Sequence, residues 1–246
     1  MSLVVVVSDL QVPLHSQRHV EALERFIRAV KPAKVVSVGD EADFTGISKW
    51  AKGTPLQYET NLHKEREATV DVLRRLRVTD MVRSNHTDRL FNSITMRLPE
   101  FRHLPELDLA HFLRLDSIGV TYHRKPTEIV PGWILAHGDE GNISQQGGVT
   151  ALNLAKRFGK SVVCGHTHRM GLMHHTEAMN GKPTRTLWGM EVGNLMDMRK
   201  ATYLKGGYGN WQQGFGLLYV DGNKVTPQLV PMRPDGSFDA HGKQWK

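Results

Sequence analysis

The chain has 246 residues, 39% of them hydrophobic and 23% charged, and a formal net charge of +7 at pH 7. These values exclude a disordered, collagen-like or coiled-coil chain and allow a full hydrophobic core, while the positive charge would attract phosphates and nucleic acid. The apolar run at residues 3–7 is far shorter than the roughly 18 residues of a membrane-spanning helix. The single cysteine, Cys164, cannot form an internal disulfide. We therefore expect a cytoplasmic protein without a membrane partner.

The first part of the sequence alternates between predicted strands and helices. Continuous β-branched runs are typical of buried strands, and apolar residues that recur every three or four positions predict helices. Ser16 is a predicted N-cap of the first helix, and Pro32 lies just past its end. The predicted strands are 4–7, 35–38 and 80–83, and the predicted helices are 20–30 and 65–77. This order favours a layered α/β core.

The rest of the chain is less regular. Residues 97–115 contain two prolines and short helical stretches, and we interpret them as an insertion. Further along, the pattern predicts strands at 119–122, 129–136 and 161–164, a helix at 145–158, and antiparallel strands at 170–176, 184–192, 215–220 and 224–230. No repeat or linker divides the chain. We expect one domain over residues 1–232 and a loose polar tail over 233–246.

Short polar clusters follow the predicted strands. Because strand ends meet at one edge of a layered sheet, these loops should converge on one pocket. Asp, Asn and His are ligands suited to Mn, Fe, Zn or Mg, and they are too many for one tetrahedral ion, which predicts two ions that share a bridging carboxylate. The clusters are Asp9-Leu10-Gln11, Gly39-Asp40, Asn85-His86, His137-Gly138 and Gly165-His166-Thr167-His168.

These motifs resemble the calcineurin-like metallophosphoesterase family. The family pattern is Asp-x-His, Gly-Asp-x-x-Asp, Gly-Asn-His-Asp/Glu, a later His and Gly-His-x-His, and the match runs in register over residues 3–168. The resemblance implies an α/β fold: a four-layer αββα sandwich of two mixed sheets flanked by helices, with a dinuclear metal site at the strand ends. The overall sequence is similar to small phage-encoded members.

The resemblance also implies the metal ligands. Asp40 would bridge the two metals. The remaining ligands would be Asp9, His168 and Gln11 at the first metal and Asn85, His137 and His166 at the second. The implied cofactors are two divalent cations, with Mn expected and Fe, Zn, Ni or Mg as alternatives.

Three further residues acquire catalytic roles from the same resemblance. His86 would protonate the leaving oxygen, Asp43 would orient His86, and Arg89 would bind the phosphate. For Asp43 and Arg89, an ordinary surface charge remains the alternative interpretation.

The sequence departs from the family pattern at three positions. Gln11 stands where His is usual, Ser84 where Gly is usual and Thr87 where an acid is usual. An amide oxygen binds first-row metals more weakly than imidazole does, so the first metal site is predicted to be the looser one. His15, four residues further along, is an alternative contact.

The expected reaction is hydrolysis of a phosphoester by a metal-bridging hydroxide. We favour a phosphodiesterase acting on nucleotides or cyclic nucleotides, because a diester carries one fewer charge and tolerates a weak first metal site. A phosphomonoesterase, such as a protein or nucleotide phosphatase, a nuclease or nucleic-acid end-repair enzyme, and a non-catalytic binding protein are the alternatives. The expected substrate-binding residues are Arg89, His15, Tyr208 and Trp211, and nucleic acid remains an alternative partner.

Overall fold

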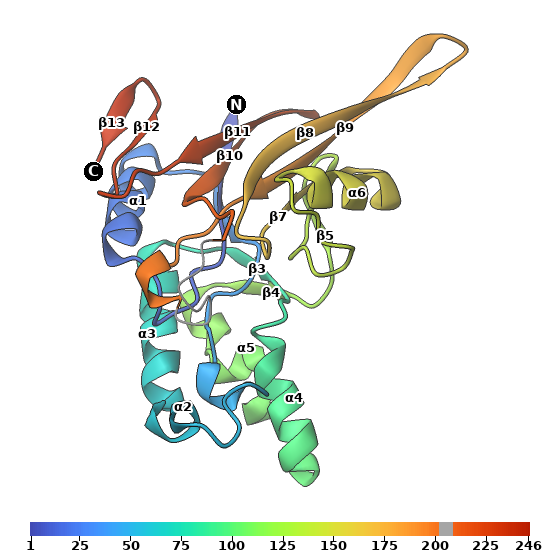
Figure 1. The fold of residues 1–246 in the computed structure, drawn as a ribbon. Coiled ribbons are helices and arrows are strands. Elements are labelled where there is room, and N and C mark those ends of the chain that lie inside the picture. The colour runs from blue at the N-terminus through green and yellow to red at the C-terminus, as the bar shows by residue number, and fades with distance from the viewer. Residues whose placement is uncertain (202–208) are drawn as a thin grey trace.

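The computed structural model describes residues 1–201 and 209–246, and its strands form two large sheets and one short hairpin (Figure 1). The first sheet has the order β11-β10-β1-β2-β3-β4, and the second has the order β5-β6-β7-β9-β8. The first sheet is built from β1 (Ser2–Val7), β2 (Lys34–Ser37), β3 (Asp80–Val82), β4 (Thr121–His123), β10 (Gly214–Asp221) and β11 (Lys224–Pro231). The second is built from β5 (Thr127–Val130), β6 (Trp133–Leu135), β7 (Ser161–Cys164), β8 (Met170–Met179) and β9 (Lys182–Val192).

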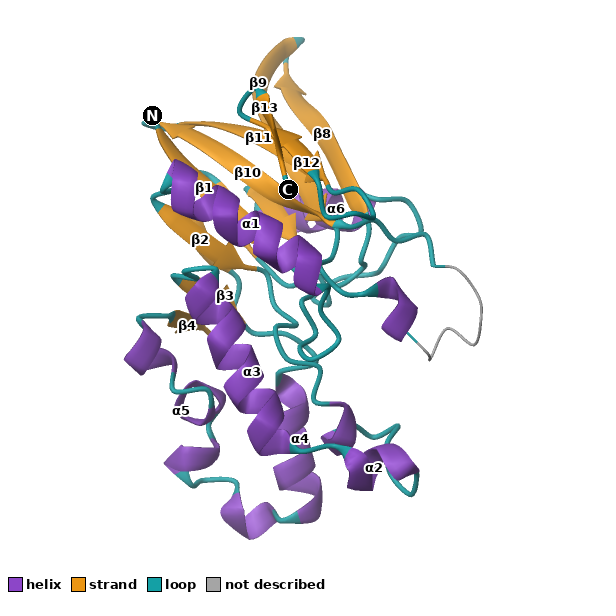
Figure 2. Cartoon of the chain, turned by 90° about the vertical axis from the view of Figure 1, so that its left-hand side faces the viewer, coloured by secondary structure: helices purple, strands orange, loops and turns teal. Residues whose placement is uncertain are grey.

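The helices lie outside the sheets and below them (Figure 2). They are α1 (Gln17–Val30), α2 (Pro55–Glu59), α3 (Leu62–Arg75), α4 (Asp88–Arg97), α5 (Leu109–Phe112) and α6 (Val149–Phe158). Short 3₁₀ turns occur at Thr45–Ile47, Pro99–Phe101, Pro105–Leu107, Leu115–Ile118 and Met198–Lys200. Within the described ranges, no helix has both the length and the apolar character needed to cross a membrane.

Three apolar clusters separate four layers and confirm the predicted αββα sandwich. Side chains alternate between the two faces of a strand, so Val5 and Val7 of β1 pack with α1 and α3, whereas Val4 and Val6 pack against the second sheet. A third cluster fills the space between the second sheet and α6, where Leu154 is buried. The central strands β1, β2 and β7 are therefore buried on both faces over most of their length, as their continuous apolar sequences predict.

Both sheets mix parallel and antiparallel pairs in a way that gathers the strand ends. Strands β1, β2, β3 and β4 are parallel neighbours, and β6, β7 and β9 are parallel neighbours in the other sheet. The antiparallel pairs flank these parallel strands and involve β10 and β11 in the first sheet and β5 and β8 in the second, where the long β8–β9 hairpin extends beyond the sandwich (Figure 1). The carboxyl ends of the central strands consequently meet at one edge of the sandwich.

The prediction of a single strand over residues 129–136 is wrong. The structure has two antiparallel strands here, β5 and β6, which are joined by a turn at Pro131-Gly132. Proline cannot donate a ladder hydrogen bond, and Gly132 adopts a φ of +75° that disfavours other residues.

The C-terminal segment is ordered, which corrects the prediction of a loose tail over 233–246. It forms the hairpin of β12 (Phe238–Ala240) and β13 (Lys243–Trp245). Phe238 is fully buried, and the centroid of its ring lies 5.6 Å from that of Phe26 and 5.0 Å from that of Phe215. The centroids of the Trp245 and Phe26 rings are 5.0 Å apart. Aromatic burial holds this polar segment against α1.

Candidate metal centre

The seven predicted metal ligands lie in loops that directly follow β1, β2, β3, β6 and β7. Main-chain hydrogen bonds connect these loops: the Gln11 amide donates to the Asp40 carbonyl at 2.8 Å, and the Gly165 amide donates to the His137 carbonyl at 2.9 Å. The Leu195 amide, which follows β9, donates to the Asp9 carbonyl at 3.3 Å. The parallel topology and these bonds bring distant parts of the sequence into one site.

Unusual backbone conformations are concentrated in the same loops. Of the eleven non-glycine residues with positive φ in the described ranges, five are predicted ligands: Asp9, Gln11, Asp40, His166 and His168. Such conformations cost energy, and they cluster where a side chain must be aimed for function. Their position here is independent support for a site.

Two glycines allow the loops to approach closely. A Cβ at Gly165 would lie 1.9 Å from Ser8 Oγ and 2.5 Å from Asp9 Oδ2. A Cβ at Gly39, where φ is +110°, would lie 2.6 Å from His137 Nδ1. Any larger residue would displace the neighbouring ligand loops.

Asp40, His137 and His166 form the best-defined group. One ligand atom of each lies within 4.8 Å of the others, and His137 and Asp40 are buried. His137 Nδ1 donates to the Val38 carbonyl at 2.8 Å, which leaves Nε2 as an acceptor. That Nε2 faces two further acceptors, Asn85 Oδ1 at 2.7 Å and Asp40 Oδ1 at 3.5 Å. Three converging acceptors fit a cation between them.

The electrostatics of this group also fit a cation. Burial raises the pKa of Asp40, but the electrostatic interactions with His137 and His86 outweigh it, so the net pKa lies below the usual value. Burial lowers the pKa of His137, but Asp40 and Asp9 outweigh it and the net pKa is raised. The buried carboxylates therefore favour positive charge beside His137, and a metal bound there would compete with protons for its imidazole.

Asp9, Gln11 and His168 form an adjacent group. Asp9 Oδ1 lies 3.0 Å from His168 Nε2, and the His168 interaction outweighs the effect of burial, so the pKa of Asp9 is lowered. Gln11 is 2% exposed, its Nε2 lies 3.1 Å from His168 Nε2, and its Oε1 is buried without a hydrogen-bond partner. A buried amide oxygen without a partner needs an explanation, and a cation ligand is the one that the neighbours support. The donor set therefore fits divalent cations.

His86 lies beside the Asp40 group and contacts two other predicted residues. Its Nδ1 is 3.2 Å from Asp43 Oδ1, although not aligned as a hydrogen bond, and its Nε2 accepts from Arg89 Nη2 at 2.8 Å. Arg89 also donates to the Asp43 carbonyl and lies 3.6 Å from its carboxylate. Because a guanidinium only donates, His86 Nε2 carries no proton in this arrangement. The predicted trio is brought together as expected, while its catalytic roles stay predictions.

Only some of the predicted substrate-binding residues line the pocket at the metal residues. A pocket of about 650 Å³ opens over the metal residues and is lined by Arg89 and Trp211, whose ring centroid lies 4.4 Å from that of His168. His15 does not line this pocket; its backbone pairs with Met196 instead. The structure thus places Gln11, and not His15, next to His168. Tyr208 lies outside the described residues.

Ser84 and Thr87 support the Asp40 loop, a role that their place in the sequence does not indicate. Ser84 Oγ accepts from the Asp40 amide at 2.9 Å and bonds Thr87 Oγ1 at 2.9 Å. These are two of the three positions that depart from the family pattern. The departures are therefore a matched pair of hydroxyls that supports the loop of Asp40.

Two further supporting groups were missed because their partners are distant in sequence. Arg83 binds both carboxylate oxygens of Asp139 at 2.7 Å, which anchors the loop that carries His137. Buried Glu191 accepts from Thr167 Oγ1 at 2.6 Å and from the Ala151 amide at 3.3 Å. It ties the loop after β7 to the first turn of α6.

Comparison with known proteins gives relatives over nearly the whole chain, although no family model matches the sequence. The Gene 54 protein of Mycobacterium phage D29 is 38% identical, and that of Mycobacterium phage L5 is 36% identical, each over 99% of this chain and 98% of its own length. Among solved structures, vacuolar protein sorting 29 from Cryptosporidium parvum aligns with a TM-score of 0.51 and 16% identity, over 99% of this chain and 94% of that one. At this identity the likeness shows a shared fold.

Proposed function

We propose that this chain, which belongs to the same family as the Gene 54 proteins of Mycobacterium phages D29 and L5, is a metal-dependent phosphoesterase. The observation that carries the proposal is the close approach of three potential ligand atoms, His137 Nε2, Asn85 Oδ1 and Asp40 Oδ1, in the group that also contains His166. The His86, Asp43 and Arg89 trio lies directly beside it. An acid–base group and a guanidinium next to a cation site suit phosphoryl transfer to water.

The residues that would hold the cations are the seven described above. Divalent cations bound there would supply charge neutralisation of the phosphate and a water that is acidic enough to attack near neutral pH. The chain's own contribution is to fix these ligands before substrate arrives. The strained loops, the two glycines and the Ser84 support serve that purpose.

His86 is the proposed proton donor to the leaving oxygen. A phosphate oxygen competes with His86 Nε2 for the Arg89 guanidinium, because both are acceptors within reach of the same donor. Once Arg89 donates to the phosphate, His86 Nε2 can bind a proton, and the carboxylate of Asp43 beside Nδ1 stabilises the imidazolium. His86 can then protonate the departing oxygen.

For the substrate we propose a phosphodiester of a nucleotide. The pocket of about 650 Å³ has the size of a small-ligand site, and Trp50, Trp211 and Leu14 give it apolar walls against which a base can pack. A diester also carries one charge fewer than a monoester, which suits a first metal site with an amide in place of an imidazole.

A substrate panel on the full-length protein with added Mn²⁺ tests the function. Bis(p-nitrophenyl) phosphate, p-nitrophenyl phosphate and a cyclic nucleotide are assayed in parallel, with Asp40→Asn and chelator as controls. We expect hydrolysis that depends on Mn²⁺ and is faster for the diesters. Turnover of every ester at no more than the Asp40→Asn level would overturn the proposal.

A further inference from the structure

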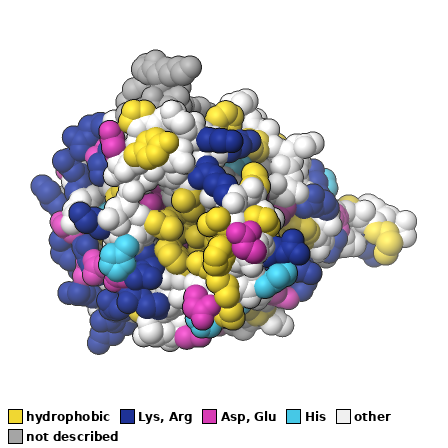
Figure 3. All heavy atoms as spheres, turned by 90° about the horizontal axis from the view of Figure 1, so that it is seen from below, with side chains coloured by type: hydrophobic (Ala, Val, Ile, Leu, Met, Phe, Trp, Pro, Cys, Tyr) yellow, Lys and Arg dark blue, Asp and Glu magenta, His cyan; other side chains and the backbone are white. Residues whose placement is uncertain are grey.

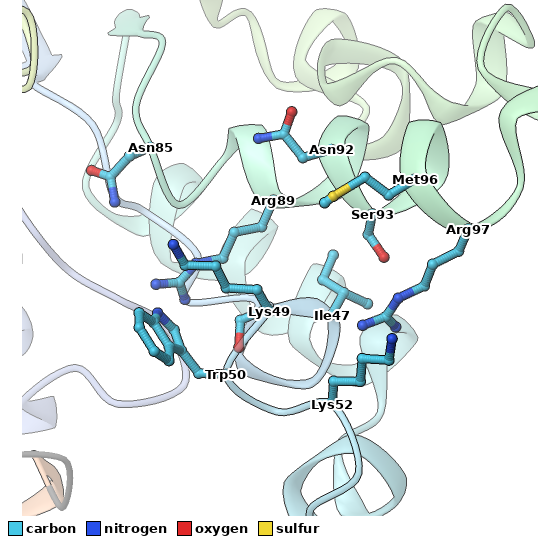
Figure 4. Close-up of a pocket in the computed structure, with 11 residues that line it drawn as sticks. Ile47, Lys49, Trp50, Lys52, Asn85, Arg89, Asn92, Ser93, Met96 and Arg97 are labelled. Carbon is cyan, nitrogen blue, oxygen red and sulfur yellow. The ribbon is translucent and has the colours of Figure 1, made fainter.

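A second pocket, of about 640 Å³, adjoins the metal pocket and has four lining residues in common with it: Ser48, Trp50, Asn85 and Arg89. We call it the cationic pocket, because its lining contains four basic side chains and no carboxylate. The basic residues are Lys49, Lys52, Arg89 and Arg97. Its position makes it an extension of the metal pocket on the side of α4 (Figure 4).

Three of these basic side chains lack a carboxylate partner. Arg89 pairs with Asp43, but no carboxylate in the described ranges lies within ion-pair distance of Lys49, Lys52 or Arg97. Figure 4 shows the Arg97 and Lys52 side chains pointing toward one another at the end of the pocket away from Asn85. Like charges that converge without a counter-charge repel each other, and an anion between them removes the repulsion.

The length of α4 sets the size of that anion. Arg89, Ser93 and Arg97 follow one another at intervals of four residues and therefore lie along one face of the helix. Arg89 and Arg97 are about 12 Å apart along the axis, at ~1.5 Å per residue. A stacked nucleic-acid strand rises ~3.4 Å per nucleotide, so this distance corresponds to about three to four nucleotides. A single phosphate would not span it.

Exposed apolar side chains beside the cations indicate which polyanion fits. Trp50 is 75% exposed, Met96 is 70% exposed, and Lys49 Nζ lies 4.8 Å from the centre of the Trp50 ring. On the lower face of the molecule an apolar centre is bordered by basic, acidic and histidine side chains (Figure 3). Aromatic rings beside phosphate-binding cations are typical of proteins that bind single strands, because unpaired bases can stack on the rings.

We propose that the cationic pocket binds single-stranded nucleic acid, with Lys52 and Arg97 on its phosphates and Trp50 on a base. Nucleotides on one side of the ester at the metal centre would lie along α4. The hydrolytic part of this inference rests on the proposed function, whereas strand binding does not. In that reaction one water adds to phosphorus and one P–O ester bond breaks, which leaves a phosphomonoester end and a hydroxyl end.

Salt-dependent binding of a fluorescein-labelled decathymidylate, in the presence of chelator, tests the phosphate contacts. The variant is Lys52→Gln with Arg97→Gln in the full chain. Each phosphate contact in a single strand contributes about 0.7 to the slope of log affinity against log salt, so the slope should fall by about 1.4. At low salt the affinity should fall about ten-fold.

A matched pair of charge removals serves as control. Lys160→Gln with Arg185→Gln removes the same charge from exposed residues that pair with Glu128 and Glu177 beside the second sheet. The control should keep the wild-type slope. An unchanged slope in the Lys52 and Arg97 variant, or an equal loss in both variants, would overturn the proposal.

Trp50 tests whether a base is bound as well as the phosphates. Trp50→Ala should weaken decathymidylate binding about ten-fold and leave binding of an abasic strand of equal length unchanged, whereas Trp50→Phe should retain most of the affinity. Equal losses on both strands would contradict the stacking contact.

Parallel hydrolysis of bis(p-nitrophenyl) phosphate separates the two proposals. If the small diester is hydrolysed and the Lys52 and Arg97 variant cleaves the strand as well as wild type does, the pocket assignment is wrong and the proposed function stands. If no ester is hydrolysed but the slope falls as predicted, the pocket assignment stands and the proposed function is wrong.

Discussion

Replacing Ser84 by alanine should weaken both the fold and the metal site. The Ser84 hydroxyl is fully buried, accepts from the Asp40 amide at 2.9 Å and bonds the Thr87 hydroxyl at 2.9 Å. In Ser84→Ala the buried Asp40 amide loses its acceptor. A buried polar group without a partner costs about 1–3 kcal/mol, so the free energy of unfolding should fall by that amount.

The same substitution releases the loop that aims Asp40 at the metals. Loss of a residue that supports a metal ligand typically weakens metal affinity by about 10- to 100-fold. Because metal binding adds RT ln(1 + [L]/Kd) to stability, a ten-fold weaker Kd reduces the Mn²⁺-dependent stabilisation by about 1.4 kcal/mol at saturation. The two effects of the substitution can therefore be measured separately.

Urea unfolding in chelator measures the loss of stability, and urea unfolding over a series of Mn²⁺ concentrations measures the loss of affinity. Ser117→Ala is the control, because the exposed Ser117 hydroxyl donates only to the Arg114 carbonyl, far from the site in sequence. If Ser84→Ala loses stability in chelator but keeps the full Mn²⁺-dependent gain, Asp40 does not depend on this support. If it loses neither, the hydrogen bond to the Asp40 amide contributes nothing.

Three further predictions concern single side chains. His86→Ala should keep its metal content. It should hydrolyse esters with poor leaving groups far more slowly than wild type does, but lose less activity on nitrophenyl esters, because nitrophenolate leaves without a proton. Equal losses on both kinds of ester would count against a proton donor. Gln11→His should lower the Mn²⁺ concentration needed for half-maximal activity, because imidazole binds Mn²⁺ better than an amide oxygen does; superimposable titrations would show that residue 11 does not touch the metal. Burial raises the pKa of Glu65 from 4.5 to about 7. The folded state therefore keeps this proton to a higher pH than the unfolded state does, and the free energy of unfolding falls as the pH rises through this range. Glu65→Gln should equal wild type in urea unfolding near pH ~4 and be more stable by about 3 kcal/mol near pH ~8; a difference that does not vary with pH, or that also appears in the exposed Glu106→Gln, would refute this.

The layered fold and the gathering of the ligands could be predicted because both follow from short segments of the sequence. Three of the central strands, β1, β2 and β7, contain short β-branched runs, and ligands follow each of them within a few residues. Parallel pairing then forces the ligands to one edge, whatever the details of packing. The burial of alternating valines in two different cores follows from the same two-residue period.

Features that depend on distant partners could not be predicted. Phe238 reads as an isolated aromatic in a polar segment, and only the fold brings Phe26 and Phe215 to it. The Arg83–Asp139 pair joins loops 56 residues apart. Lys52 and Arg97 look like ordinary surface charges in the sequence, and only the fold brings them to one pocket.

Small residues at turns were also underestimated. The Pro131-Gly132 pair divides one apolar run into two strands, although that run alone looks like a single strand. Ser84 and Thr87 are departures from a motif, yet they hold the Asp40 loop. In each case the pattern of apolar residues was clear, and a local hydrogen bond or turn decided the outcome.

Metal content and diester hydrolysis, measured on the same preparation of wild type and Asp40→Asn after loading with Mn²⁺, test the central claim most directly. Asp40 faces His137 and His86 and belongs to the group whose ligand atoms lie within 4.8 Å of each other. We predict up to about two Mn²⁺ per wild-type chain. Asp40→Asn should lose most of the metal and most of the hydrolysis of bis(p-nitrophenyl) phosphate, while its circular dichroism remains that of the wild type. Full metal content together with full activity in Asp40→Asn would contradict the account.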